Sequence, residues 1–448
     1  MNFQIIPGDV PLPLPTGGLA FFDWLFHILL VVSWVAHILF INVLLGASLA
    51  SVYFNKKGVR TGEKVYDRVG YLLTTPVTIS ENMGALWGVA PLLLISVMFT
   101  PLFYSAAVMN SPQWLHIIYG NIVAFLLSYL YKFTWHTLED RKGLHVTLGT
   151  ISVILFFSLP PVFMATVQLY FTPSTWEYTT RFWDALLRPD TLFRLAHFYL
   201  ATFAVTGVFM LAYGYFKRKS DDALDQAAGA VLVRTGKVWF LVPTVLNFFV
   251  GPLVLFHFPS YGLEAFFNSG YFWLIILTVV LMLYGIWLLL KDFFSDDLPP
   301  AKMWTVVGLM LVAVLSMATL RHGMRLSLTA PVMAQSIAKS EDFQARAQVA
   351  FEKAKLAKAA AADAAAAGPK GRQLAEEHGC LGCHAENERL VGPSYAEVAK
   401  KGYTVEQIVK LVAQPVPANW PGYDEMPPMP DVPAADVAEI ASWINSLK

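Results

Sequence analysis

Long apolar runs separated by short polar stretches fill most of the chain before residue 335. A helix needs about 20 mostly apolar residues to cross a bilayer, and eight stretches meet that requirement. They are centred near Trp34, Leu93, Leu126, Phe157, Val205, Phe248, Leu277 and Leu311. The pattern predicts an all-α, polytopic membrane helix bundle of about eight spans over residues 1–335.

Basic residues in the connections predict the orientation of the bundle, because lysine and arginine near helix ends stay on the cytoplasmic side. The first, third, fifth and seventh connections carry fifteen of them. The N-terminus and the second and sixth connections carry none, and the fourth carries Arg181, Arg188 and Arg194. We therefore expect both termini on the periplasmic side of a bacterial cytoplasmic membrane. The first apolar run is too long for a cleavable signal and should remain as a helix.

Beyond the eighth run, residues 336–369 are charged and rich in alanine, which is typical of a partly helical linker. Gly368 and Pro369 would end such a helix. Residues 370–448 then form a small separate domain. The whole chain is 56% hydrophobic, and its 32 basic residues balance 32 acidic ones. This composition points to the lipid bilayer as the environment and gives no reason to expect nucleic acid as a partner.

The clearest chemical motif is Cys380-Leu-Gly-Cys383-His384. Its two cysteines are the only ones in the chain, and their spacing lets both thiols form thioethers with the vinyl groups of haem. His384 would supply the proximal iron ligand. A zinc site would need two further ligands. The motif predicts one covalently attached haem c, which agrees with a periplasmic C-terminus because this haem is attached outside the cytoplasm.

A second signal is the Met426-Pro-Pro run before the last predicted helix. Together with the run from Cys380 to Tyr395, it makes residues 371–448 resemble the bacterial cytochrome c551 type, a small all-α class I cytochrome c. The resemblance implies that Met426 is the distal iron ligand, with Met429 as its competitor. A His/Met pair raises the reduction potential, so we expect single-electron transfer near the positive end of a respiratory chain.

Histidines in the membrane part suggest further cofactors, because an ionisable side chain within a span usually has a partner or a function. Most of them fall toward the predicted periplasmic side, which suggests b-type haems there. For each histidine, the alternative is a hydrogen-bonded structural role. The eight are His27, His37, His116, His136, His145, His197, His257 and His322.

Two of these histidines lie in recognisable segments, the run from His37 to Gly46 and the run Phe193-Arg-Leu-Ala-His197. The segments are similar to the first and fifth helices of subunit I of the cytochrome bd oxygen reductases, whose histidines ligate haem. This weak resemblance spans about residues 20–330. It implies that His37 and His197 bind one or more b haems, leaves haem d open, and implies a second membrane subunit.

The chain also departs from that family. Only Lys217 to Lys237 separates the fifth and sixth helices, so the family's long quinol-binding segment is missing. The paired glutamates of the family's third helix have no counterpart in the run from Gly120 to Ser128. The first departure argues against quinol oxidation, and the second argues against efficient oxygen chemistry.

Three further charged residues have two interpretations each. Arg321 and Arg325 lie four residues apart on one helical face, where they would hold haem propionates or anchor the helix at the membrane interface. Glu81 precedes Asn82-Met83-Gly84, so we expect it in a loop at the cytoplasmic face. Its alternative is a proton-pathway or haem-iron carboxylate.

These observations favour a membrane-bound b/c-type cytochrome, an oxidoreductase component of a respiratory chain. Electrons would enter from a soluble periplasmic cytochrome or another donor and reduce oxygen, or would come from quinol and leave through haem c. The alternative is a haem-free anchor subunit that tethers an electron-transfer cytochrome c domain.

Overall fold

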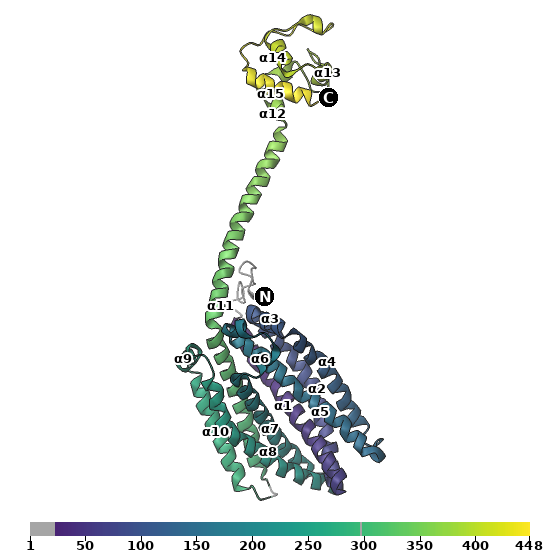
Figure 1. The fold of residues 1–448 in the computed structure, drawn as a ribbon, viewed down its shortest axis with the longest axis vertical. Helices are drawn as coiled ribbons and strands as arrows, with labels where there is room; N and C mark the ends of the chain where they lie inside the picture. The colour runs from purple at the N-terminus through teal and green to yellow at the C-terminus, as the bar shows by residue number, and fades with distance from the viewer. Residues whose placement is uncertain (1–22, 296–297) are drawn as a thin grey trace. The chain divides into compact units, whose positions relative to one another are not determined.

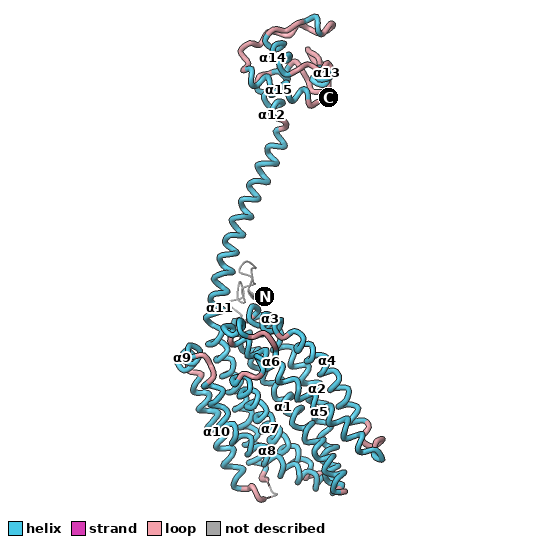
Figure 2. Tube along the Cα trace, viewed as in Figure 1, coloured by secondary structure: helices cyan, strands magenta, loops and turns pink. Residues whose placement is uncertain are grey.

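The computed structural model describes residues 23–295 and 298–448, and helices dominate these ranges (Figures 1 and 2). No strand occurs among the described residues. The chain divides into two compact units, with the boundary between Phe343 and Gln344. The predicted all-α fold class is confirmed.

Eight helices in the described ranges are long and apolar enough to cross a bilayer, and each predicted centre falls within one of them. Large apolar side chains such as Leu126 and Phe133 are exposed on the bundle, as expected for a surface that faces lipid. The spans are α1 (Asp23–Thr61), α2 (Lys64–Met98), α4 (Ser111–Phe133), α5 (Lys142–Phe171), α7 (Pro189–Lys217), α8 (Ala223–Phe256), α10 (Phe272–Lys291) and the first part of α11 (Pro300–Ala367).

Three short helices lie at one end of the bundle: α3 (Thr100–Met109), α6 (Phe182–Leu186) and α9 (Ser260–Asn268) (Figure 1). Apolar residues from all three share a buried core with the end of α5. The hydrophobic pattern did not predict these helices because none is long enough to span. We call this end the capped end, and the opposite end, which holds the connections rich in lysine and arginine, the basic end.

The spans α7 and α8 pack backbone against backbone along a line of glycines. A Cβ at Gly207 would lie 2.5 Å from the backbone nitrogen of Phe240, and one at Gly214 would lie 2.7 Å from the carbonyl oxygen of Gly229. Small residues allow membrane helices to approach this closely. The glycines therefore fix how α8 is placed beside α7.

Helices α1 and α7 are joined by buried polar contacts at mid-bundle. The hydroxyl of Thr202 lies 2.9 Å from Oδ1 of Asn42, and the hydroxyl of Thr206 donates to the carbonyl of Asn42 over 2.8 Å. Gly46 faces Thr206, whose Oγ1 would lie 2.1 Å from a Cβ at position 46. These contacts set the register of the two helices.

The second unit ends in a small domain of four helices, α12 (Lys370–Glu377), α13 (Tyr395–Lys400), α14 (Val405–Ala413) and α15 (Ala434–Asn445). Helix α12 crosses α15 closely at Gly371, where an added Cβ would lie 2.4 Å from the Cβ of Trp443. Tyr395 and Trp443 lie at the centre of the buried core. The preceding α11 ends at Ala367, before Gly368 with its positive φ of 76°.

Candidate functional site

A cleft of about 200 Å³ opens in the C-terminal domain. Its walls are mostly aliphatic and aromatic side chains from α14, α15 and the loops between them. Cys380, Cys383 and His384 line the same cleft, as do Met426 and Met429. The structure therefore brings all the residues predicted to hold haem c to one apolar pocket, which fits a largely apolar macrocycle.

The imidazole of His384 is oriented by two contacts. Its Nδ1 donates to the carbonyl of Pro393 over 2.7 Å, and its ring stacks on Tyr395 with centroids 5.4 Å apart. The bond at Nδ1 fixes the tautomer and leaves Nε2 as the lone-pair nitrogen. Gly392 makes room for the ring, since a Cβ there would lie 2.4 Å from Cε1 of His384. This is the arrangement that an imidazole ligand to iron requires.

Cys380 begins a single 3-10 turn over Cys380–Gly382, and Cys383 follows the turn directly. Gly379, just before the turn, lies in the left-handed region at φ 71°. Cys380 is half-buried and Cys383 is exposed. Both sulfurs face the cleft and fit thioether formation with a macrocycle placed over His384.

The two candidate distal methionines both reach the cleft. Both side chains are half-buried. The backbone nitrogen of Met429 donates to the carbonyl of Val412 over 3.0 Å, which ties that residue to the end of α14. The geometry admits either thioether as a ligand, so Met426 remains a prediction.

This domain is similar in sequence to known proteins. The model of the family described as Cytochrome c matches residues 369–448. The cytochrome c-551 of Allochromatium vinosum is 40% identical over 79 residues, which cover 16% of this chain and 82% of that protein. The cytochrome c-552 of Hydrogenobacter thermophilus is 37% identical over 78 residues, or 17% of this chain and 80% of its own. The cytochrome c-551 of Azotobacter vinelandii is 37% identical over 82 residues, or 17% and 98%.

The cleft, the oriented imidazole and the paired thiols define an electron-transfer domain of the class I cytochrome c kind. The chain belongs to the cytochrome c family through this C-terminal domain. Its cofactor is therefore haem c, and the predicted resemblance to the c551 type is confirmed. The matched residues cover only this domain, so the function of the membrane unit rests on its own geometry.

In the membrane unit, His37 and His197 lie on different interhelix contacts. His37 faces α2, where its Nδ1 lies 2.8 Å from the carbonyl of Gly84 and its ring fills the space beside Gly88. His197 faces α8, near Gly251, and its Nδ1 is buried with no hydrogen-bond partner in the described part of the chain. The structure does not bring the two imidazoles together, so they fit two separate haem sites rather than one shared iron.

Both histidines nevertheless lie at a similar depth. His37 lies five residues before Asn42, and His197 lies five residues before Thr202, which contacts Asn42. Helices α1 and α7 run in the same direction. They lie in the half of the bundle nearer the capped end. Nε2 of His37 and Nδ1 of His197 take part in no hydrogen bond recorded among the described residues, so each imidazole has a ring nitrogen that a metal would take.

Near these histidines, Arg194, Arg321 and Arg325 form a cluster, in which Arg194 and Arg325 are buried and Arg321 is half-buried. Arg321 lies close enough to the other two for their charges to repel. Nη1 of Arg194 is buried with no hydrogen-bond partner in the described ranges, and its guanidinium lies 4.8 Å from the ring centroid of Phe171. Among the described residues, none of the three arginines forms an ion pair with a carboxylate. Such a cluster needs an anion, and haem propionates fit it.

Arg194 corrects one prediction. The charge pattern placed it in the fourth connection, but α7 begins at Pro189 and Arg194 lies inside that helix, almost fully buried. The nearest acid, Asp190, is bonded instead to Arg188 over 2.8 Å and to Gln168. The sequence signal that could have placed it was its position three residues before His197, on the same helical segment.

His27 and His322 form a histidine pair close to this cluster. Nε2 of His322 lies 2.8 Å from Nδ1 of His27, and Nη1 of Arg325 lies 3.0 Å from Nδ1 of His322. An arginine only donates, so Nδ1 of His322 accepts and its Nε2 donates to His27. Arg325 is thus partly engaged by His322, which the spacing to Arg321 alone did not predict.

Glu81 corrects a second prediction. It lies within α2, fully buried, and not in a loop. The run Asn82-Met83-Gly84 does not break the helix, because Gly84 packs closely against Ile41 of α1 and its carbonyl is used by His37. The carboxylate instead accepts a hydrogen bond from the hydroxyl of Ser128 in α4.

Proposed function

We propose that this protein is a b/c-type cytochrome of a respiratory chain, in which electrons pass between the haem c domain and b-type haems in the membrane unit. His37 and His197 would each ligate one b haem. Arg321 and Arg325, joined by Arg194, would hold propionates. The observation that carries this proposal is the cluster of Arg194, Arg321 and Arg325, which form no ion pair with a carboxylate among the described residues, because a cluster of like charges in a span is costly.

We further propose that electrons enter through the haem c domain on the periplasmic side. A soluble cytochrome or another small donor would reduce haem c, whose potential a His/Met pair raises. The connection between α7 and α8 supports this direction, because only residues 218–222 separate the two helices. That length leaves no quinol-binding segment of the kind found in the bd oxygen reductases.

Oxygen is the acceptor that the bd resemblance implies, and a second membrane subunit would complete the complex. The Arg321 and Arg325 side chains would compensate the negative charge of the haem propionates. His37 and His197 would ligate the irons of two haems, one at the contact with α2 and one at the contact with α8. Haem b supplies the one-electron chemistry when bound. The same resemblance leaves haem d open.

The direct test is a reduced-minus-oxidised spectrum of the purified full chain, with pyridine haemochrome quantification. We expect both b and c signals, with at least one b haem for each c haem. A preparation with haem c alone would overturn the membrane-haem proposal and would favour the haem-free anchor. Oxygen uptake driven by reduced cytochrome c then tests the acceptor, and the absence of uptake in a b-containing preparation would exclude oxygen.

A further inference from the structure

Glu81 has an unusual environment for a membrane carboxylate. Its Oε2 is buried and has no hydrogen-bond partner in the part of the chain that the structure describes, while Oε1 accepts from Ser128. Lys132 lies one turn beyond Ser128, but its ammonium group donates to the hydroxyl of Thr78 over 2.9 Å. The carboxyl group therefore has one oxygen available and no ion pair among the described residues. An ionised carboxylate in this setting is costly.

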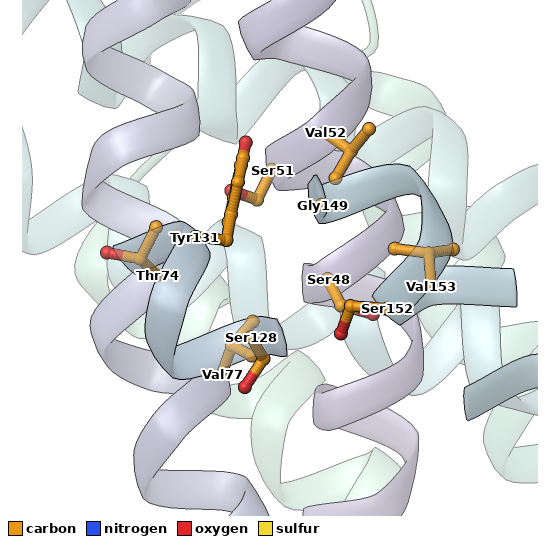
Figure 3. A pocket seen from close by; sticks show the side chains of 10 residues that line it. All are labelled: Ser48, Ser51, Val52, Thr74, Val77, Ser128, Tyr131, Gly149, Ser152 and Val153. Atoms are coloured by element: carbon orange, nitrogen blue, oxygen red, sulfur yellow. The ribbon is translucent and has the colours of Figure 1, made fainter. Parts of the chain in front are cut away.

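A small cavity lies next to Ser128, enclosed by α1, α2, α4 and α5 (Figure 3). Its volume is about 10 Å³, which is the space of about one water molecule. The hydroxyl of Tyr131, which lines this cavity, is buried and has no hydrogen-bond partner among residues 23–295 and 298–448. A site with unpaired polar groups favours a water. The polar lining consists of Ser48, Ser51, Thr74, Ser128, Tyr131 and Ser152.

On the side of the cavity toward the basic end, His145 is fully buried against Tyr131. Its Nε2 lies 2.7 Å from the carbonyl oxygen of Tyr131, and its Nδ1 lies 3.2 Å from Oδ1 of Asn55. The amide of Asn55 donates to Asp67 over 2.9 Å. Both neighbours of the imidazole are thus acceptors, although a neutral imidazole carries only one N–H.

Hydrogen-bond counting in this cluster requires one more proton than neutral His145 and ionised Asp67 provide. Reversing the Asn55 amide would give His145 a donor, but it would set the amide oxygen against the Asp67 carboxylate. The bonds are all satisfied when either His145 or Asp67 carries the extra proton. Asp67 also accepts from Lys142 over 3.1 Å and from the indole of Trp135 over 3.2 Å.

We propose that α1, α2, α4 and α5 form a proton-binding site in which Glu81 accepts a proton delivered from the His145–Asp67 cluster. The extra proton leaves the cluster, passes through water in the cavity beside Tyr131, and reaches Glu81 through the hydroxyl of Ser128, which lines the cavity and donates to Oε1. The cluster is reloaded from solvent at the basic end, where the Asp67 side chain is 34% exposed. The facing charges are Lys132 and Lys142, and the Arg68–Asp225 pair of α2 and α8 lies beyond them.

The proton-binding site stands without any membrane haem, and only its use in balancing the charge of haem reduction rests on the proposed function. It differs from the bd pattern noted above, because the carboxylate comes from α2 and points at the place on α4 where Ser128 stands. The structure thus places a buried acid, Glu81, beside α4, the third span, whose own sequence lacks the paired glutamates.

The test is infrared difference spectroscopy of the full chain in detergent after a change of pH. We expect a protonated-carboxyl C=O band that is lost in Glu81→Gln, shifted in Ser128→Ala and kept, at a shifted frequency, in Glu81→Asp. Glu63→Gln, an exposed acid at the basic end, is the matched control and should leave the band unchanged. An unchanged band in Glu81→Gln would overturn the proposal.

The delivery route has its own readout. Transfer into D₂O shifts the C=O band of an exchangeable acid, and we expect this exchange to slow by at least about tenfold in His145→Gln while the band itself persists. An unchanged exchange rate would overturn delivery through the cluster. A third measurement is the infrared difference spectrum on reduction. A response of the Glu81 band to reduction requires membrane haem. If only this response is absent, the result contradicts the proposed function and not the proton-binding site.

Discussion

Gly392 lies directly against the imidazole of His384, and a Cβ at position 392 would come within 2.4 Å of Cε1. Gly392→Ala should therefore displace the imidazole from its bond with Pro393 and destabilise the haem domain by about 1–3 kcal/mol. Denaturant unfolding followed by haem c absorbance measures the effect. Gly382→Ala is the matched control, because nothing lies within 4 Å of its added Cβ; equal loss in both variants would contradict the steric argument.

Met426→Ala should lower the potential of haem c and make it high-spin, because the thioether is a strong-field ligand that raises the potential. Axial ligation controls potentials over roughly 0.8 V, so the shift should be large in a redox titration. Met429→Ala should change neither property. The reverse pattern would assign the distal position to Met429, whose backbone the bond to Val412 already fixes.

His37→Ala and His197→Ala should each remove b-type absorbance and leave the c signal intact. A b haem depends on its axial ligand and pocket, whereas haem c is held covalently in its own domain. Because the two imidazoles face α2 and α8 separately, each variant should remove only part of the b signal. His136→Ala is the control, and loss of b absorbance in that variant would show a general folding defect.

Arg321→Leu should weaken retention of haem b by on the order of tenfold, if its guanidinium holds a propionate as proposed. The b-to-c haem ratio after purification measures this. Without a bound anion, the same change would relieve repulsion among the three clustered arginines and raise the thermal midpoint of the membrane unit. Arg60→Leu, at the exposed end of α1, should alter neither quantity.

The capping box of α13 predicts a pH dependence for the haem domain. Hydrogen bonds from the backbone and the side chain of Ser394 hold the pKa of Glu397 below its ordinary value. A depressed pKa in the folded state contributes stability above the unfolded pKa, about 4.3, and this stability is lost as pH falls through the folded pKa. Unfolding midpoints between neutral and acid pH should fall less steeply in Glu397→Gln, whereas Glu377→Gln should keep the wild-type slope.

Much of the architecture could be predicted from the sequence, because the forces behind it are local. A span needs a continuous apolar run, and all eight predicted centres lie in the eight membrane helices. The haem motif is also local, with the ligand next to the attachment cysteines. The short helices α3, α6 and α9 escaped prediction because their burial comes from contacts with other spans.

The membrane site was harder to predict, because its character depends on which helices meet. Arg194 read as a connection residue, yet α7 begins early enough to bury it between Phe171 and Phe258. Glu81 stood beside residues that favour a break, yet packing against α1 and the bond from Ser128 keep it in a helix. The spacing of Arg194 from His197 indicates that both lie on one helix, but the partners that bury Arg194 and Glu81 come from other parts of the chain.

The glycine line between α7 and α8 has a consequence for how this protein tolerates change. Gly207 and Gly214 touch no ionisable group, yet each leaves less than 3 Å between a would-be Cβ and the backbone of α8. A methyl group there would separate the helix that carries His197 from the helix its imidazole faces. In a saturation mutagenesis experiment, these chemically inert positions should rank with the candidate haem ligands among the least replaceable in the bundle.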